Sequence, residues 1–266
     1  MEAFCVSRRD LLKLGGAGLA ILASGIELKA ADTEPVIGLI FPPAVKPLPE
    51  LDMMYPKGAK FLMMGLGVGT MTPEAFDALI PKVTSAAKEM KAKGAQGVVF
   101  MASSMTFYKG AEFNKQLVQS MRDATGLPCT TQSSAIVDGL NAFKAKRVAV
   151  ATAYGDDINR RLTIFLKESG FQVEFIKGLE LVLIDDPAKV TDKELMALCT
   201  DVCKSAPKAD ALLISCGGLI TLRIHTALEK QFNIPVISST PVGLWAGVRM
   251  MGMNSRVPGL GRLLEL

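Results

Sequence analysis

Hydrophobic residues occur along this sequence in short runs, which alternate with longer stretches whose apolar positions repeat every three or four residues. The short runs are rich in aliphatic residues and are bounded by glycine, proline or polar residues, as is typical of strands buried on both faces. They predict strands at 35–41, 60–66, 97–102, 147–153, 173–179, 211–216 and 235–240. The periodic stretches between them predict amphipathic helices, several of which end at a glycine.

This alternation predicts an α/β fold in which helices cover parallel sheets. Several strands share a similar ending in small polar residues, which predicts two similar α/β lobes, 33–133 and 134–250. Pro128 and the TTQSS run at 130–134 indicate a loop at their boundary. The segment 251–266 is expected to pack back on the lobes. Because open parallel sheets bind ligands beyond the carboxyl ends of their strands, we expect the active site in the cleft between the lobes.

The first thirty residues have a different character. Arg8 and Arg9 precede a modest Gly/Ala-rich apolar run that ends in small residues, as is typical of a twin-arginine export signal over 1–31. An N-terminal amphipathic helix is the alternative. The signal predicts cleavage, export of the folded chain by the twin-arginine machinery to the periplasm, and no stable membrane insertion afterwards. If the signal is not used, the chain stays in the cytoplasm.

Composition narrows the chemistry. The 266 residues carry a net charge of +4 without a basic block, which gives no support for nucleic-acid binding. His225 is the only histidine, so a Ser-His-Asp or Cys-His device would have to use it, and a zinc site would have to be nearly all thiolate. We therefore predict no metal site, and a structural or surface role for His225. Cys199 and Cys203 lie four apart in a helical pattern, which predicts core packing. The GLGVG run matches no nucleotide-binding pattern.

Polar groups that could take part in catalysis follow several predicted strands. Cys216 precedes Gly217 and Gly218, which offers a thiol and freed backbone N–H groups, while hydroxyls follow other strands at Ser103, Ser104 and Tyr154. Such a set of donors with one titratable thiol is suited to stabilising a developing oxyanion. For Cys216 alone, a small buried packing cysteine is the alternative, and for the two serines it is helix capping.

Seven motifs together resemble arylmalonate decarboxylases, within the aspartate/glutamate racemase superfamily, over about residues 35–263. They are FPPA (41–44), GLGVGTMTPE (65–74), SSMTFYKGAEFN (103–114), ATGLPCTT (124–131), ATAYGDDIN (151–159), SCGGL (215–219) and PVISSTPVGLW (235–245). The resemblance implies two flavodoxin-like lobes with the active site between them. It also implies that the chain uses neither a metal nor an organic cofactor.

The resemblance further assigns roles. Cys216 would be the catalytic acid, and Ala102 stands where racemases of the superfamily carry a second cysteine. The groups implied to hold one substrate carboxylate in a dioxyanion hole are Ser103, Ser104, Tyr154, Gly217 and Gly218. Those implied to surround the other carboxylate with apolar groups are Pro42, Pro43, Val68, Met71, Ile184 and Pro187. For the Cys216 pKa, backbone donors and a helix start are expected to lower it, and an adjoining anionic substrate to raise it.

The leading prediction is cofactor-independent decarboxylation of α-aryl- or alkenyl-substituted malonates to one enantiomer, R by the resemblance, in a monomer acting on a small dicarboxylate. Since Ala102 cannot transfer a proton, protonation from one face is favoured over two-base chemistry. A racemase or maleate-type isomerase of the same superfamily is one alternative, and an exported dicarboxylate-binding protein is another. Ala102 in place of the usual glycine, with the bulky Met71 and Ile184, predicts reduced room for an aryl group.

Overall fold

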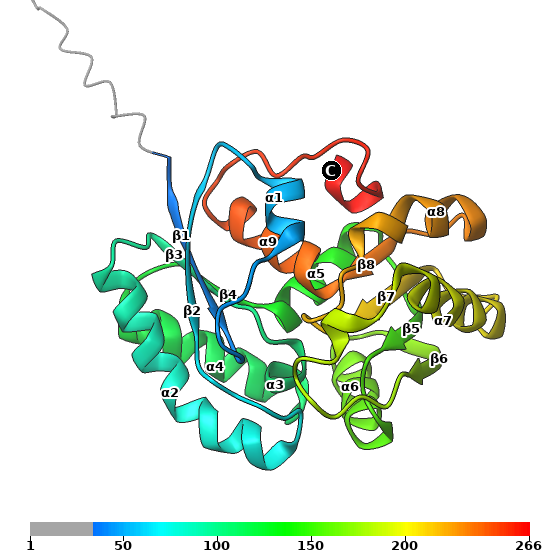
Figure 1. Cartoon of the computed structure of the whole chain (residues 1–266), viewed down its shortest axis with the longest axis horizontal. Helices are drawn as coiled ribbons and strands as arrows, with labels where there is room; N and C mark the ends of the chain where they lie inside the picture. The colour runs from blue at the N-terminus through cyan, green and yellow to red at the C-terminus, as the bar shows by residue number, and fades with distance from the viewer. Residues whose placement is uncertain (1–33) are drawn as a thin grey trace, which may run out of the picture. The chain divides into compact units, whose positions relative to one another are not determined.

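The structure, a computed structural model, describes residues 34–266 and contains two four-stranded parallel sheets (Figure 1). The predicted export signal lies outside the described residues. The first sheet has the order β2-β1-β3-β4 and consists of β1 (Val36–Phe41), β2 (Lys60–Gly65), β3 (Gly97–Phe100) and β4 (Cys129–Thr131). The second has the order β6-β5-β7-β8 and consists of β5 (Arg147–Thr152), β6 (Gln172–Gly178), β7 (Ala211–Ser215) and β8 (Val236–Ser238).

Helices follow the strands in both halves. In the first half they are α1 (Pro49–Met54), α2 (Pro73–Ala92), α3 (Ser103–Phe107), α4 (Gly110–Thr125) and α5 (Gln132–Ala142). In the second they are α6 (Asp156–Glu168), α7 (Asp192–Ser205), α8 (Leu222–Phe232) and α9 (Ser239–Met250), with short 3₁₀ turns η2 (Pro187–Lys189) and η3 (Arg262–Glu265). The predicted α/β class is confirmed, and the two sheets have the same strand order.

The central strands are buried because helices cover them on both faces. Every residue of β3 and of β7 is buried, whereas the edge strands β2 and β6 are only partly covered. Gly38 of β1 allows α2 to lie close, because a Cβ there would be 3.2 Å from Met90. Burial on both faces explains why the central strands are continuous hydrophobic runs in the sequence.

Strand β4 corrects the sequence-based prediction. The segment around 130–134 was predicted as a loop, but Cys129–Thr131 pairs with β3 and α5 begins at Gln132. Thr131 caps this helix, since its hydroxyl accepts a hydrogen bond from Ser134 N–H at 3.1 Å. A three-residue strand with two threonines gives too short a hydrophobic run to be recognised. The predicted boundary between 133 and 134 falls in the first turn of α5.

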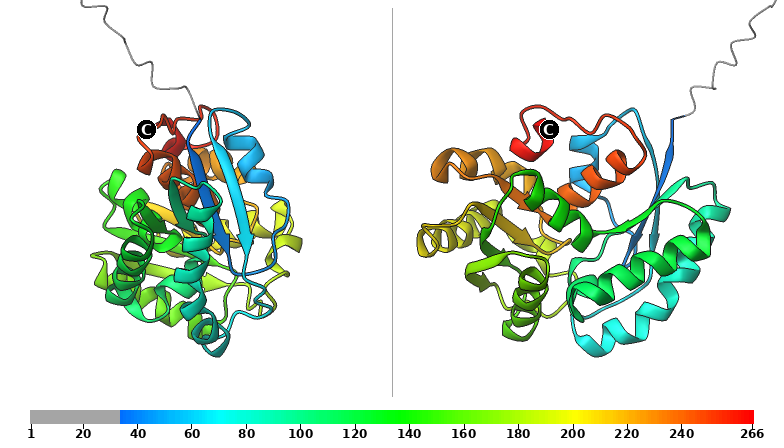
Figure 2. Two further views of the ribbon diagram at one scale, coloured as in Figure 1. Left: turned by 90° about the vertical axis from the view of Figure 1, so that its left-hand side faces the viewer. Right: turned by 180° about the vertical axis from the view of Figure 1, so that it is seen from behind.

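Two helices cross between the halves of the molecule. The helix α9 follows β8 but packs against β3 and β4, and Gly247 lies so near the first sheet that a Cβ would be 2.9 Å from Val99. Conversely, α5 follows β4 and contacts β8, where a Cβ on Gly139 would be 3.3 Å from Ile237. The two helices also pack on each other between the sheets (Figure 1; Figure 2, right). Each sheet therefore depends on a helix that follows a strand of the other.

The C-terminal segment returns to the second sheet. Its turn η3 contacts β8, and the backbone N–H of Arg262 donates to the buried Glu229 carboxylate. Among residues 34–266, no helix combines the length and the apolar character needed to cross a membrane.

Candidate active site

A small cavity of about 70 Å³ lies at the carboxyl ends of the central strands. It is lined by Phe41, Pro42, Pro43, Met71, Met101, Ala102, Ser103, Ser104, Gln132, Tyr154, Ile184, Cys216, Gly217 and Gly218. The first-sheet strands contribute the segments after β1 and β3, and the second-sheet strands contribute those after β5 and β7. The cavity therefore brings together residues that lie up to 177 positions apart, from Phe41 to Gly218.

Cys216 immediately follows β7 and is buried. Its own backbone N–H donates to Ser239 Oγ at 3.1 Å, and its carbonyl accepts from Leu219 N–H at 3.2 Å, which closes a tight turn. Among the described residues, the N–H of Gly217 donates to no other protein group. The turn thus holds the thiol and one free backbone donor side by side at the cavity wall.

The thiol of Cys216 is less acidic than an exposed cysteine. Burial raises its pKa to about 11, although backbone N–H groups of Gly218 and Leu219 and the Tyr154 phenol act in the opposite direction. We expected a local lowering by backbone donors and a helix start. The donors are present, but α8 begins only at Leu222, and desolvation outweighs them. Cys216 is therefore a protonated thiol at neutral pH.

Ala102 occupies the end of the equivalent strand in the first sheet. It is buried, lines the same cavity, and precedes α3 as its N-cap residue. Its methyl group can neither give nor accept a proton. The two strand ends therefore present one acid and one inert side chain to the cavity.

Neutral hydrogen-bond donors form the polar part of the cavity. The hydroxyls of Ser103 and Tyr154 are 2.9 Å apart, and both residues are buried. Burial, followed by the neighbouring Cys216, raises the Tyr154 pKa well above its usual value, so the phenol keeps its proton. Ser104, beside Ser103 in the first turn of α3, also lines the cavity. These hydroxyls and the Gly217 N–H can bind an anion without a cation among the lining residues.

Tyr154 is held by a network behind the cavity. Its N–H donates to Thr152 Oγ1 at 3.1 Å, and its carbonyl accepts from Asn159 Nδ2 at 3.2 Å. Gly178, at the end of β6, passes so close that a Cβ would be 1.9 Å from the Tyr154 carbonyl oxygen. The ring packs edge-on against Phe107 at 5.8 Å between centroids. Tyr154 is therefore fixed by contacts from four elements, β5, α6, β6 and α3.

The serine side of the cavity is fixed in the same way. Ser133 Oγ donates to the Ser103 carbonyl at 3.1 Å. Thr106 Oγ1 lies 2.6 Å from the Ala102 carbonyl and 2.7 Å from Ser133 Oγ. These buried hydroxyls tie α3 to α5, so the backbone that carries Ala102 and Ser103 has little freedom to move.

Apolar residues form another part of the lining. Pro42 and Pro43 follow β1, and Val68 N–H donates to the Pro42 carbonyl at 2.8 Å. Met71 N–H donates to the carbonyl of Val182 at 3.0 Å, an antiparallel contact that joins the loop after β2 to the loop after β6. This contact places Met71 and Ile184 at the same cavity.

Two of the predicted pocket residues do not line the cavity. Val68 supports Pro42 through its backbone, and Pro187 lies behind Gly218, where an added Cβ would be 3.0 Å from the proline ring. Val68 and Pro187 therefore pack behind residues that line the cavity and do not line it themselves. All the other predicted site residues line the cavity.

Sequence reasoning missed Phe41, Met101 and Gln132 as lining residues. Phe41 ends β1 and Met101 directly follows β3, both within predicted hydrophobic strands. Gln132 was placed in a loop, whereas it is the fully buried first residue of α5. The signal that could have found it is its position directly after a strand, the same position that the other site residues occupy.

The remaining candidate groups lie elsewhere. His225 is buried, its Nε2 is 2.8 Å from Ser238 Oγ, and it does not line the cavity. Burial lowers its pKa to about 4. Cys199 and Cys203 are buried on α7 and unbonded, as predicted from their spacing. Within residues 34–266, no group of three or more His, Cys, Asp or Glu side chains could hold a metal ion.

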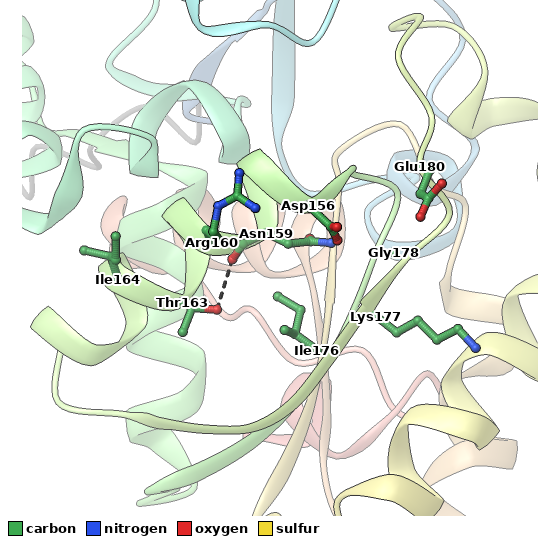
Figure 3. Close-up of a pocket in the computed structure, with 9 residues that line it drawn as sticks. All are labelled: Asp156, Asn159, Arg160, Thr163, Ile164, Ile176, Lys177, Gly178 and Glu180. Atoms are coloured by element: carbon green, nitrogen blue, oxygen red, sulfur yellow. Dashed lines mark hydrogen bonds between the residues drawn. The ribbon is translucent and has the colours of Figure 1, made fainter.

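A larger surface groove of about 540 Å³ lies beside α6 and β6 (Figure 3). Its lining mixes charged side chains such as Asp156, Arg160 and Lys177 with Ile164 and Ile176, and Thr163 bonds to the Asn159 carbonyl within α6. It includes none of the predicted site residues. Its size alone does not make it the reactive site.

Comparison with known proteins identifies the family of this chain. The family described as arylmalonate decarboxylase matches residues 37–264. The arylmalonate decarboxylase of Bordetella bronchiseptica is 42% identical over 87% of this chain and 97% of its own length. A crystal structure of arylmalonate decarboxylase is 40% identical, with a TM-score of 0.79 over 87% of this chain and 99% of that one.

Maleate isomerases are more distant relatives. The maleate isomerase of Nocardia farcinica is 30% identical, but over only 51% of this chain and 53% of its own length. A maleate isomerase structure from Pseudomonas putida shares the fold, with a TM-score of 0.80 at 21% identity over 88% of this chain and 98% of that one. With nearly its whole described length matched, the chain belongs to the arylmalonate decarboxylase family, a family of carboxy-lyases.

Proposed function

We propose that the protein decarboxylates α-aryl- or alkenyl-substituted malonates without a cofactor, and that Cys216 protonates one face of the intermediate. In the first step the bond between the α-carbon and one carboxylate breaks. That carboxylate leaves as CO₂, and its electron pair passes to the α-carbon and the retained carboxylate, giving an enediolate. In the second step the α-carbon takes the Cys216 proton, and the thiolate recovers a proton from water.

Neutral donors support binding of the retained carboxylate. Ser103, Ser104, Tyr154 and the N–H of Gly217 are the groups available at the cavity wall. Negative charge on the two oxygens grows when the enediolate forms, so each donor stabilises the transition state more than the bound substrate. Loss of one such donor typically costs about 3–4 kcal/mol of activation free energy.

The apolar lining supports loss of the other carboxylate. Pro42, Pro43, Met71 and Ile184 offer no side-chain donor to a carboxylate. An anion without hydrogen-bond partners is disfavoured there, whereas neutral CO₂ is not. The proposal therefore orients the substrate with its retained carboxylate toward Ser103.

One observation carries the proposal: Cys216 and Ala102 follow corresponding strands of the two sheets, β7 and β3, and only Cys216 is an acid. Burial keeps the Cys216 thiol protonated, as a proton donor must be. A single donor gives a single enantiomer, and family resemblance points to R. Two-base racemisation has no second acid at the position of Ala102.

The test is decarboxylation of α-methyl-α-phenylmalonate in D₂O, followed by CO₂ release and chiral analysis. We expect one enantiomer with deuterium at the α-carbon. Cys216→Ala should lower kcat at least about a hundredfold, because general-acid catalysis is lost. The control is Cys203→Ala, which removes a buried thiol from α7 rather than from the cavity. Racemic product, or full activity of Cys216→Ala, would contradict the proposal.

A further inference from the structure

Gln132 carries a buried polar atom that the proposed reaction does not use. Among residues 34–266, three buried side-chain polar atoms lack a hydrogen-bond partner: Gln132 Oε1, Ser215 Oγ and Trp245 Nε1. Of these three residues, only Gln132 lines the catalytic cavity. Its side chain is fully buried, so its carbonyl oxygen has no bulk water to accept from.

The neighbouring Thr240 settles which end of the amide is free. Thr240 Oγ1 donates its only proton to the Gly217 carbonyl at 2.9 Å. It can therefore only accept from Gln132, whose Nε2 lies 3.5 Å away. The amide nitrogen is directed to Thr240, which leaves the carbonyl oxygen as the unpaired atom.

Two glycines confine the side chain. A Cβ on Gly217 would be 3.0 Å from Gln132 Oε1, and one on Gly243 would be 3.0 Å from its Cγ. The amide is thus packed beside the turn that carries Cys216, and no donor among residues 34–266 bonds to Oε1. A partner for Oε1 has to come from whatever occupies the cavity.

We propose that Gln132 Oε1 accepts a hydrogen bond from a hydroxyl or amino group on the substrate's α-substituent. An unpaired buried acceptor is costly, and a donor-bearing substrate removes that cost, whereas a plain hydrocarbon substituent does not. The small cavity, about 70 Å³, leaves room only for a compact donor such as a hydroxyl or amino group beside Gln132. This inference rests on the proposed decarboxylation and specifies its substrate class.

The test uses matched malonates that differ by one hydroxyl. The first pair is α-methyl- and α-hydroxymethyl-α-phenylmalonate, and the second has a vinyl group in place of the phenyl group. The third compares phenylmalonate with its ring-hydroxylated counterparts. For each pair, kcat/KM of the hydroxylated compound is divided by that of its parent, in the wild type and in Gln132→Met. Comparing the two quotients cancels the intrinsic reactivity of each substrate.

We expect the quotient to fall at least about tenfold in Gln132→Met for at least one pair, because methionine keeps the length and removes the acceptor. The variant should melt at the same or a higher temperature, which separates lost recognition from lost folding. The control is Gln96→Met, since Gln96 is exposed and accepts from Val36 N–H at the start of β1, far from the cavity lining. Quotients unchanged within about twofold for all pairs would overturn the inference while leaving the proposed function intact.

A second readout covers an enzyme that decarboxylates none of these malonates. Calorimetry then compares binding of the two phenyl-substituted monoacids that the first pair would yield. Preference of the wild type for the hydroxylated acid, lost in Gln132→Met, would support the inference on its own. Equal affinities would overturn it together with the proposed function.

Discussion

At the scale of single residues, burial decides the chemistry of Cys216 more than its neighbours in the sequence do. The SCGG motif indicates a thiol beside freed backbone donors, and those donors are present. The motif does not indicate how deeply the thiol is buried, because that depends on residues from both sheets. Desolvation disfavours the thiolate, so the proton stays on sulfur until the pH is well above neutral.

The pH dependence of kcat follows from this raised pKa. In the proposed mechanism the thiol is the active form, so activity should persist as pH rises and be half lost only near pH 11, where the Cys216 pKa lies. An unperturbed cysteine would be half deprotonated at about pH 8.5. The measurement is kcat from about pH 7 to about pH 11, alongside the rate of inactivation by iodoacetamide. A midpoint at about pH 8.5 in both the kcat profile and the inactivation profile would contradict the raised Cys216 pKa.

The residue scale also shows where sequence reasoning stops. Cys216, Ser103 and Tyr154 could be predicted because each follows a recognisable strand and belongs to a motif. Gln132 could not, because its unpaired oxygen exists only through packing against Gly217, 85 positions away by the numbering, and Thr240. Val68 and Pro187 do not line the cavity, since a motif indicates which residues are neighbours but not which way a side chain points.

At the scale of elements, the loops after the strands are fixed by backbone contacts from adjacent strands. The long central strands were predicted, because covered parallel strands read as continuous hydrophobic runs. The three-residue β4 was missed, because its identity depends on pairing with β3 and not on its own hydrophobicity. Gly178 belongs to the same category, since its importance comes from the close approach of β6 to Tyr154.

Replacing Gly178 with alanine should therefore displace Tyr154. A Cβ would lie 1.9 Å from the Tyr154 carbonyl oxygen, so the backbone has to shift. We expect kcat/KM to fall at least about tenfold, because small displacements of catalytic groups are costly. Tyr154→Phe should then cost less in the Gly178→Ala background than in the wild type, since the phenol is already misplaced.

The control for this prediction lies in the loop that carries Tyr154. Gly155 has φ −80°, and a Cβ there would meet nothing within 4 Å, so Gly155→Ala should leave kcat/KM unchanged. Additive effects of Gly178→Ala and Tyr154→Phe would show that Gly178 acts through something other than the phenol.

At the scale of the whole molecule, a buried carboxylate joins the two halves. Glu50, in α1, accepts hydrogen bonds at Oε1 from the N–H groups of Thr221 and Leu222, at 2.7 and 3.0 Å, and from Thr221 Oγ1 at 2.8 Å. It thereby binds the N-terminus of α8. The short PELDMM helix gives no hint of this role in the sequence, because its partners are 171 and 172 positions away.

Glu50→Ala should lower the free energy of unfolding by about 1–3 kcal/mol, because it leaves buried N–H groups at the start of α8 without an acceptor. Urea denaturation measures the effect. Asp52→Ala, an exposed change in the same helix, is the control and should alter stability by less than about 0.5 kcal/mol. Equal effects of the two changes would show that the contact with α8 contributes nothing.

The exchange of α5 and α9 between the sheets restricts how a substrate can be admitted. Swinging the sheets apart would strip α9 from β3 and β4, where a Cβ on Gly247 already has no room. A hinge motion that separates the sheets would therefore break this packing. We expect substrate to enter and leave through the short connections around Pro43 and Ile184, which line both the cavity and a neighbouring surface pocket.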